Sequence, residues 1–170
     1  MSALIPGELP FAADVPLAVQ QAYRGAQVFC TERALAQAVD RLAVRLTLSY
    51  QDANPFVLVR LPEAAVFAGM LQQRMVTPLR VGYLSADVQV DEATVDAATV
   101  LLLVGRAEES AAALMAGDAA VVAMVADDAA EVADCALRAD RTVTLLGSGL
   151  DYLGYGTNLP GLYQISQDRV

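Results

Sequence analysis

Carboxylates are the most numerous side chains in this sequence that could do chemistry. Twelve of the 20 acidic residues fall between residues 87 and 140, where only two residues are basic. Carboxylate oxygens are the ligands that hard cations such as magnesium prefer. The candidate magnesium ligands are Glu108, Glu109, Asp127 and Asp128. The alternative, which we favour, is that these acids are solvated at the start of a helix, where acidic side chains are common.

Several side chains that enzymes use for catalysis are missing. The sequence has no histidine, tryptophan or lysine, so all 11 basic residues are arginines. This excludes a histidine base, a lysine Schiff base, a lysine phosphate clamp and a zinc site built on histidines.

Cys30 and Cys135 lie in apolar stretches without metal-ligand spacing, and we expect buried free thiols. We therefore expect a cytoplasmic protein.

The charge and the apolar runs limit the partners. A net charge of -9 argues against nucleic acid and anionic membranes, because both are bound through lysine and arginine. The run of apolar or hydroxyl side chains at residues 97–104 is far shorter than the roughly 20 residues that span a bilayer. No basic residue precedes Arg24, so the first residues do not resemble a targeting peptide. We expect a soluble protein with no nucleic-acid and no membrane partner.

The elements that must position these groups alternate between helix and strand. After Thr31, which can cap a helix, apolar residues at spacings of four, three and four predict an amphipathic helix: Leu35, Val39, Leu42 and Leu46. Continuous apolar runs predict strands at 56–59, 79–84, 99–104, 121–125 and 143–146, with helices at 63–75 and in the alanine-rich segments between the later strands. The alternation predicts one α/β domain over residues 1–170, with a mainly parallel sheet and a helical arm at about 1–25.

Two passages carry a family resemblance. The first begins with VFCTERALAQAVDRLA at residue 28 and continues through NPFVLV, VFAG and PLRVGYLSA to residue 86. The second is GSGLDYLGYGTNLPGLY at residues 147–163. Both resemble hypoxanthine-guanine phosphoribosyltransferases, and together they cover roughly two thirds of the chain. The resemblance implies the type I phosphoribosyltransferase fold, a mainly parallel twisted sheet flanked by helices, with shortened active-site loops.

The resemblance also implies where the family's site would lie. The family transfers ribose 5-phosphate from phosphoribosyl pyrophosphate, with magnesium, to hypoxanthine or guanine. Its acid pair for the ribose hydroxyls would fall at Val104 and Gly105, and the aspartate of its phosphate loop at Glu108. Ser110 and Ala112 stand in place of that loop's glycine and threonine. Glu108 is thus a vestige, and no catalytic residue is intact.

Other parts of that site are changed as well. At residues 61–64 the family's pyrophosphate loop is replaced by LPEA, whose proline has no amide hydrogen and whose glutamate adds negative charge. The mobile lid is reduced to residues 87–99. The family's base-binding lysine would fall at Asp127 or Asp128, and of its purine contacts only Asp151 remains.

Because several elements are changed together, we expect no useful catalysis. The leading hypothesis is an inactive homologue without a cofactor. It would act as an interaction or regulatory subunit, in a homo-oligomer or with an active phosphoribosyltransferase of purine salvage. Tyr152, Tyr155 and Tyr163 are the predicted interface residues. One alternative is an active purine phosphoribosyltransferase with an altered site, which would need magnesium. Another is a sensor that binds a purine nucleotide through Asp151 and nearby glycine backbone.

Overall fold

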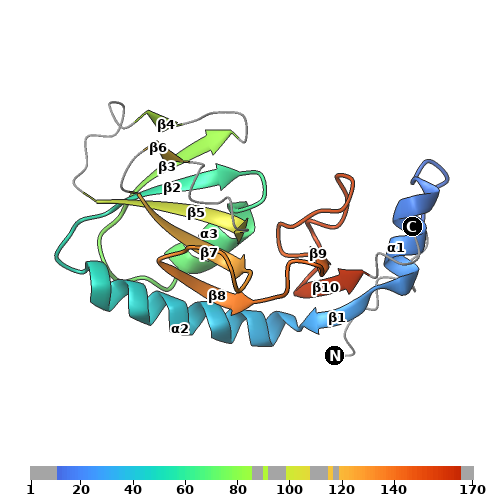
Figure 1. Ribbon diagram of the computed structural model, residues 1–170, viewed down its shortest axis with the longest axis horizontal. Helices are drawn as coiled ribbons and strands as arrows, with labels where there is room; N and C mark the ends of the chain where they lie inside the picture. The colour runs from blue at the N-terminus through green and yellow to red at the C-terminus, as the bar shows by residue number, and fades with distance from the viewer. Residues whose placement is uncertain (1–10, 86–89, 92–98, 108–114, 117–118, 166–170) are drawn as a thin grey trace.

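The structure is a computed structural model that describes residues 11–85, 90–91, 99–107, 115–116 and 119–165. Its centre is a five-stranded sheet in the order β3-β2-β5-β7-β8 (Figure 1). All neighbouring strands in this sheet are parallel. The strands are β2 (Phe56–Leu61), β3 (Arg80–Ser85), β5 (Val100–Ala107), β7 (Ala120–Ala126) and β8 (Asp134–Arg138). The predicted α/β class with a mainly parallel sheet is confirmed.

Two helices cover one face of this sheet. They are α2 (Glu32–Tyr50) and α3 (Ala65–Gln72). The predicted apolar stripe of α2 is at most 2% exposed: Leu35, Val39, Leu42 and Leu46. It packs with Phe67 of α3 against strand side chains that point the same way: Val57, Val59, Leu101, Leu103, Val122 and Met124. Thr31 caps α2 as predicted, because its Oγ1 accepts a hydrogen bond from the Ala34 amide at 3.2 Å.

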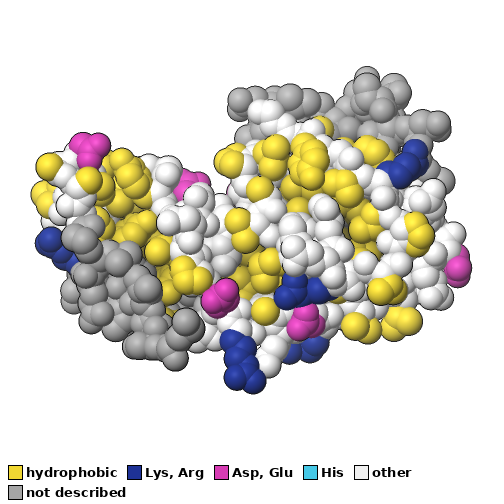
Figure 2. Space-filling model, turned by 180° about the vertical axis from the view of Figure 1, so that it is seen from behind, with side chains coloured by type: hydrophobic (Ala, Val, Ile, Leu, Met, Phe, Trp, Pro, Cys, Tyr) yellow, Lys and Arg dark blue, Asp and Glu magenta, His cyan; other side chains and the backbone are white. Residues whose placement is uncertain are grey.

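The opposite face of the sheet has its own apolar cluster. The alternate strand residues point this way, among them Leu58, Leu102, Val104, Val121 and Ala123. Seen from behind, apolar side chains reach the molecular surface in several separate places, with few charged side chains between them (Figure 2). No helix within the described ranges combines the length and apolarity that a bilayer crossing requires.

A second, smaller sheet lies beside the first. It contains β1 (Gln27–Cys30), β10 (Leu162–Ile165) and β9 (Thr144–Leu146) in the antiparallel order β1-β10-β9. Helix α1 (Leu17–Gly25) packs on this sheet through Val19 and Ala22. The strand expected at 143–146 is therefore present, but it belongs to this sheet because Leu146 pairs with Tyr163. A parallel pair of two-residue strands, β4 (Val90–Asp91) and β6 (Met115–Ala116), completes the described elements.

The helical prediction for the alanine-rich segment after β7 is wrong. Residues 127–133 form a loop with a turn at residues 128–129, and β8 then runs along the sheet edge. Pairing of β8 with β7, for example Leu137 with Val125, provides backbone hydrogen bonds that override the helix propensity of alanine. Residues 108–114, which include Glu108, Glu109, Ser110 and Ala112, lie outside the described part of the chain, as does most of the predicted shortened lid.

Candidate functional site

The carboxyl edge of the parallel sheet is the expected place for a ligand, because ligands of open parallel sheets bind beyond the carboxyl ends of the strands. Here that edge is formed by the turn after β2 and by the ends of β5, β7 and β8. The segment between β9 and β10 also reaches it, through contacts with the turn after β2. We call residues 147–161 of this segment the glycine loop.

The turn after β2 is closed by its own contacts. The Leu61–Pro62 peptide bond is cis. The Ala64 amide donates a hydrogen bond to the Arg60 carbonyl at 3.0 Å. The Arg60 Nε lies 3.9 Å from Glu63 Oε1, so this glutamate is paired within the turn. Since Pro62 has no N–H and the Ala64 amide is engaged, neither residue offers the backbone donor that a phosphate needs.

Other parts of the chain fill the place predicted for the ribose-binding acid pair. Val104 is fully buried in the apolar cluster of the sheet. Gly105 lies against the turn after β2. A Cβ atom at Gly105 would lie 2.9 Å from the Glu63 carbonyl oxygen and 2.9 Å from Leu150 Cδ2. A side chain at position 105 therefore has no room unless the backbone of the neighbouring turn moves.

The Glu63 carbonyl also contacts the glycine loop. Gly149 has a φ of +102°, and a Cβ there would lie 2.5 Å from the same carbonyl oxygen. A glycine is required for both reasons. The next residue, Leu150, is 6% exposed and covers Gly105. The Glu63 carbonyl is thus held between two glycines, and protein atoms fill the carboxyl edge at this point.

The backbone of the glycine loop bonds mainly to itself. The Gly147 amide donates to the Leu150 carbonyl at 2.9 Å, and the Gly149 amide donates to the Thr157 carbonyl at 2.9 Å. These are the glycine donors that the sensor alternative assigned to a nucleotide. Because both amides already have protein acceptors, a nucleotide would have to break these bonds to use them.

Asp151, the predicted ligand-binding residue, is exposed and faces its own turn. Its Oδ2 accepts a hydrogen bond from the Gly154 amide at 2.6 Å. This is a local side-chain to backbone bond of the kind that aspartate makes in turns. At least one oxygen of the carboxylate therefore serves the conformation of the loop.

The three predicted interface tyrosines lie in different surroundings. Tyr163, in β10, is 4% exposed and packs within its own chain against the cluster that contains α1. Tyr152 is half-buried against the same cluster, and Tyr155 is 38% exposed. The interface prediction therefore narrows to Tyr152 and Tyr155. Sequence reasoning missed Leu153 between them, which is 62% exposed.

Asp127 is the most deeply buried acid among the described residues, at 2% exposure. Its Oδ1 accepts from the Ala129 amide at 2.8 Å, and its carbonyl accepts from Arg138 Nη1. Its Oδ2 is buried and has no hydrogen-bond partner among the described residues. Asp128 is exposed. Within the described ranges, no group of three or more histidine, cysteine, aspartate or glutamate side chains is placed to hold a metal ion.

Two arginines at the carboxyl edge bind backbone carbonyls, a role that the sequence reasoning did not assign. Arg106, near the end of β5, donates to the Val143 carbonyl at 2.6 Å and to the Asp140 carbonyl at 3.1 Å. Arg138, at the end of β8, donates to the Asp127 carbonyl. These are the two basic residues of the acidic segment 87–140. Their isolation among acids was the feature of the sequence that could have pointed to a specific role. Both link the sheet to the segments that follow its strands.

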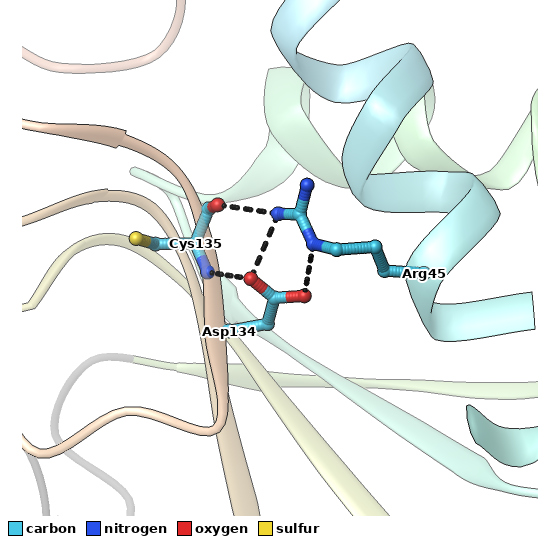
Figure 3. Close-up of polar contacts among 3 residues, drawn as sticks. All are labelled: Arg45, Asp134 and Cys135. Atoms are coloured by element: carbon cyan, nitrogen blue, oxygen red, sulfur yellow. Dashed lines mark hydrogen bonds and ion pairs between the residues drawn. The ribbon is translucent and has the colours of Figure 1, made fainter. Parts of the chain in front are cut away.

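Another polar group lies between α2 and β8 (Figure 3). Arg45 Nε and Nη2 donate to the two carboxylate oxygens of Asp134 at 2.7 and 2.8 Å, and Nη2 also reaches the Cys135 carbonyl at 3.0 Å. The hydrogen bond with Asp134 raises the pKa of Arg45. Burial raises the pKa of Asp134, but hydrogen bonds from Arg45 and the Cys135 amide outweigh it, leaving the pKa below its usual range. Burial raises the pKa of the Cys135 thiol, which disfavours the reactive thiolate.

Comparison with known proteins gives structural matches alone. Neither a protein-family model nor a curated protein matches the sequence. The HGPRT-ase of Leishmania tarentolae, solved with GMP, has a TM-score of 0.70 at 14% identity and covers 84% of this chain and 98% of its own. A hypoxanthine phosphoribosyltransferase of Trypanosoma cruzi, solved with IMP, has a TM-score of 0.69 at 12% identity, covering 86% and 94%. One from Staphylococcus aureus has a TM-score of 0.67 at 18% identity, covering 84% and 92%.

Proposed function

We propose that this chain, which has the type I phosphoribosyltransferase fold of hypoxanthine-guanine phosphoribosyltransferases, does not transfer phosphoribosyl groups. It acts instead as an interaction or regulatory subunit of purine salvage in the cytoplasm. The observation that carries this proposal is the Glu63 carbonyl, held between Gly105 and Gly149 at the carboxyl edge. A ligand at that point would have to displace backbone, which is much harder than moving a flexible side chain.

The chemistry of the carboxyl edge supports the same proposal. Phosphoribosyl pyrophosphate carries several negative charges, which backbone amides, cations and magnesium must neutralise. Here Arg106 and Arg138 donate to protein carbonyls, and Arg60 is paired with Glu63. Loss of one preorganised donor commonly lowers a rate by about 10² to 10³. With several elements changed together, we expect no turnover of biological use.

Isothermal titration of the purified protein with phosphoribosyl pyrophosphate and magnesium tests the inactive site. IMP and GMP are titrated in parallel, and an active hypoxanthine-guanine phosphoribosyltransferase in the same buffer is the positive control. We expect no heat of binding from any of the three ligands. Binding of phosphoribosyl pyrophosphate, followed by pyrophosphate release with hypoxanthine or guanine, would overturn the proposal in favour of an active enzyme.

The interaction role needs its own measurement. Affinity capture from cell extract is combined with light scattering on the purified chain. We expect either an oligomer of the chain or capture of an active purine phosphoribosyltransferase. A monomer that captures no such enzyme would contradict the interaction role, whatever the titration shows.

A purine nucleotide sensor is the second candidate, and one observation favours it. The buried Oδ2 of Asp127 has no hydrogen-bond partner in the described part of the chain, and an N–H group of a ligand would satisfy it. Thermal unfolding with saturating guanine, hypoxanthine, GMP and IMP tests this role, because a ligand bound only by the folded state raises the unfolding temperature. A rise that Asp127→Asn abolishes would support the sensor. No rise beyond about one degree would exclude it for these ligands.

A further inference from the structure

The tip of the glycine loop presents apolar side chains to solvent. We define the tip as residues 151–155. The Tyr152 amide donates to the Tyr155 carbonyl at 2.8 Å, and the Tyr155 amide donates back at 3.1 Å. Leu153 and Gly154 form the two-residue turn between them, with φ of +53° and +82°. Turns with positive φ at both central residues favour asparagine or glycine at the first.

Leucine at position 153 is unfavourable for two separate reasons. Its left-handed backbone brings Cβ close to the following carbonyl oxygen, which glycine avoids. Its side chain is also 62% exposed to water, beside the partly exposed Tyr155. Asp151 holds this conformation through the Gly154 amide. A preorganised apolar tip of this kind is explained if a partner buries it.

A second exposed apolar surface lies on α2. Four residues of α2 at spacings of three, one and three share one side of the helix: Arg41, Val44, Arg45 and Leu48. We call these four residues the α2 stripe. Val44 is 60% exposed and Leu48 is 67% exposed. The stripe therefore offers two apolar side chains one turn apart beside the exposed Arg41.

We propose that the tip of one copy of this chain docks on the α2 stripe of a second copy. Leu153 enters between Val44 and Leu48, as a knob enters a hole between residues one turn apart. Asp151 of the tip then faces Arg41. The inference rests on the proposed function, because it names the partner of the interaction subunit.

Charge and position both favour a second copy as the occupant. The chain carries a net charge of -9, so two copies repel each other except where an acid meets a base. The tip and the stripe provide such a match through Asp151 and Arg41. Within one chain the glycine loop extends away from α2, so the tip does not cover its own stripe (Figure 1). Because the tip and the stripe are different surfaces that face away from each other, the contact is heterologous, and two copies joined by it keep one free tip and one free stripe.

Light scattering and sedimentation over a range of concentrations test this association. One copy has a mass of 17.9 kDa, and we expect a mass of two or more copies at high concentration. Leu153→Asn removes the apolar anchor and suits the backbone of the turn, whereas Leu48→Asp places an acid on the stripe. Each variant is expected to raise the dissociation constant at least about tenfold, as loss of a central anchor does. Val76→Asp, at a site 84% exposed and outside both surfaces, is the matched control and should leave the association intact.

Mixing the two variants distinguishes this contact from any other mode of association. The Leu153→Asn chain keeps its stripe and the Leu48→Asp chain keeps its tip. The mixture should therefore associate through one intact contact, although neither variant does so alone. Circular dichroism and unfolding temperatures of the separate variants show that each is folded, and Leu48→Ala is a milder second change on the stripe.

Three results would each overturn the inference: a wild type that stays monomeric, a tip or stripe variant that associates like the wild type, or a mixture that does not associate. These results are distinguishable from failure of the proposed function. A monomer that binds no phosphoribosyl pyrophosphate but captures an active relative refutes this inference alone. An oligomer that binds and turns over phosphoribosyl pyrophosphate refutes the inactive site alone.

Discussion

Adding one methyl group at Gly105 tests the closed carboxyl edge directly. The new Cβ of Gly105→Ala would lie 2.9 Å from the Glu63 carbonyl oxygen and 2.9 Å from Leu150 Cδ2. The carbonyl belongs to the backbone, so the turn after β2 must shift. Overpacking of this kind costs about 1–3 kcal/mol, while the reduced entropy of the unfolded chain offsets about 0.4–1 kcal/mol. We expect a net loss of about 1–2 kcal/mol in the free energy of unfolding.

Urea and thermal unfolding measure this loss. For a chain of this length, 1 kcal/mol corresponds to about 2–4 °C, so the unfolding temperature should fall by about 2–8 °C. Gly69→Ala is the matched control because it adds the same atom in α3, where a Cβ would meet nothing within 4 Å. Alanine is better than glycine inside a helix by about 0.5–1 kcal/mol, so this variant should be stabilised.

Equal stability of Gly105→Ala and the wild type would refute the reasoning, because it would mean that the carboxyl edge has room for a side chain. Leu150→Ala provides a second arm, since it removes one of the two groups that the new methyl meets. On its own this change should cost about 2–5 kcal/mol as a buried leucine truncation. The double variant Gly105→Ala/Leu150→Ala should lose less stability than the sum of the two single losses, because the two sites are in contact.

Three further predictions concern α2 and the thiols. Arg45→Met removes the arginine partner of Asp134, and for a partly exposed pair we expect a loss of about 0.5–1 kcal/mol at neutral pH. Because the folded pKa of Asp134 is lowered, this stabilisation is complete above its unfolded pKa of about 3.9 and is lost as pH falls through the folded value. Urea curves of the two proteins should therefore converge in acid, and a constant gap would contradict the assignment. Thr31→Ala removes the acceptor of the Ala34 amide and should lower the urea stability by about 0.5–2 kcal/mol. Burial raises the pKa of Cys30, so iodoacetamide should modify it much more slowly in the folded protein than in urea, and equal rates would exclude its burial.

The helix after Thr31 could be predicted because its signals agree. The apolar spacing, the cap and the acidic first turn all indicate the same element. Strand β8 could not, since its alanine and aspartate residues carry no strand pattern. It exists because β7 offers a parallel partner and because Arg45 binds Asp134, 89 positions away in the sequence. Distant contacts of this kind are invisible to local propensity.

The candidate site, like the fold, could be predicted only in part from the sequence. The residue types alone show that no acid stands at Val104 or Gly105, where the resemblance implies an acid pair. The atoms that occupy this place could not be predicted. The Glu63 carbonyl contacts Gly105 and Gly149 only because three segments that are separate in the sequence come together in the fold. The local bond of Asp151 is typical of an aspartate in a turn and could be anticipated. The positive φ of Leu153 could not, since asparagine or glycine is the usual residue there.

The small sheet can form only when synthesis of the chain is nearly complete. Its strand β1 has one partner in the described structure, β10, and Gln27 pairs with Gln164, 137 positions later. At about 5–20 residues per second, a ribosome needs roughly 7–27 s to make the chain between them. All strands of the parallel sheet are made within that interval, while β1 waits with open hydrogen-bonding edges. An extended segment in that state can pair with the wrong strand, so a folding helper would protect this chain most by holding residues 27–30 until β10 emerges.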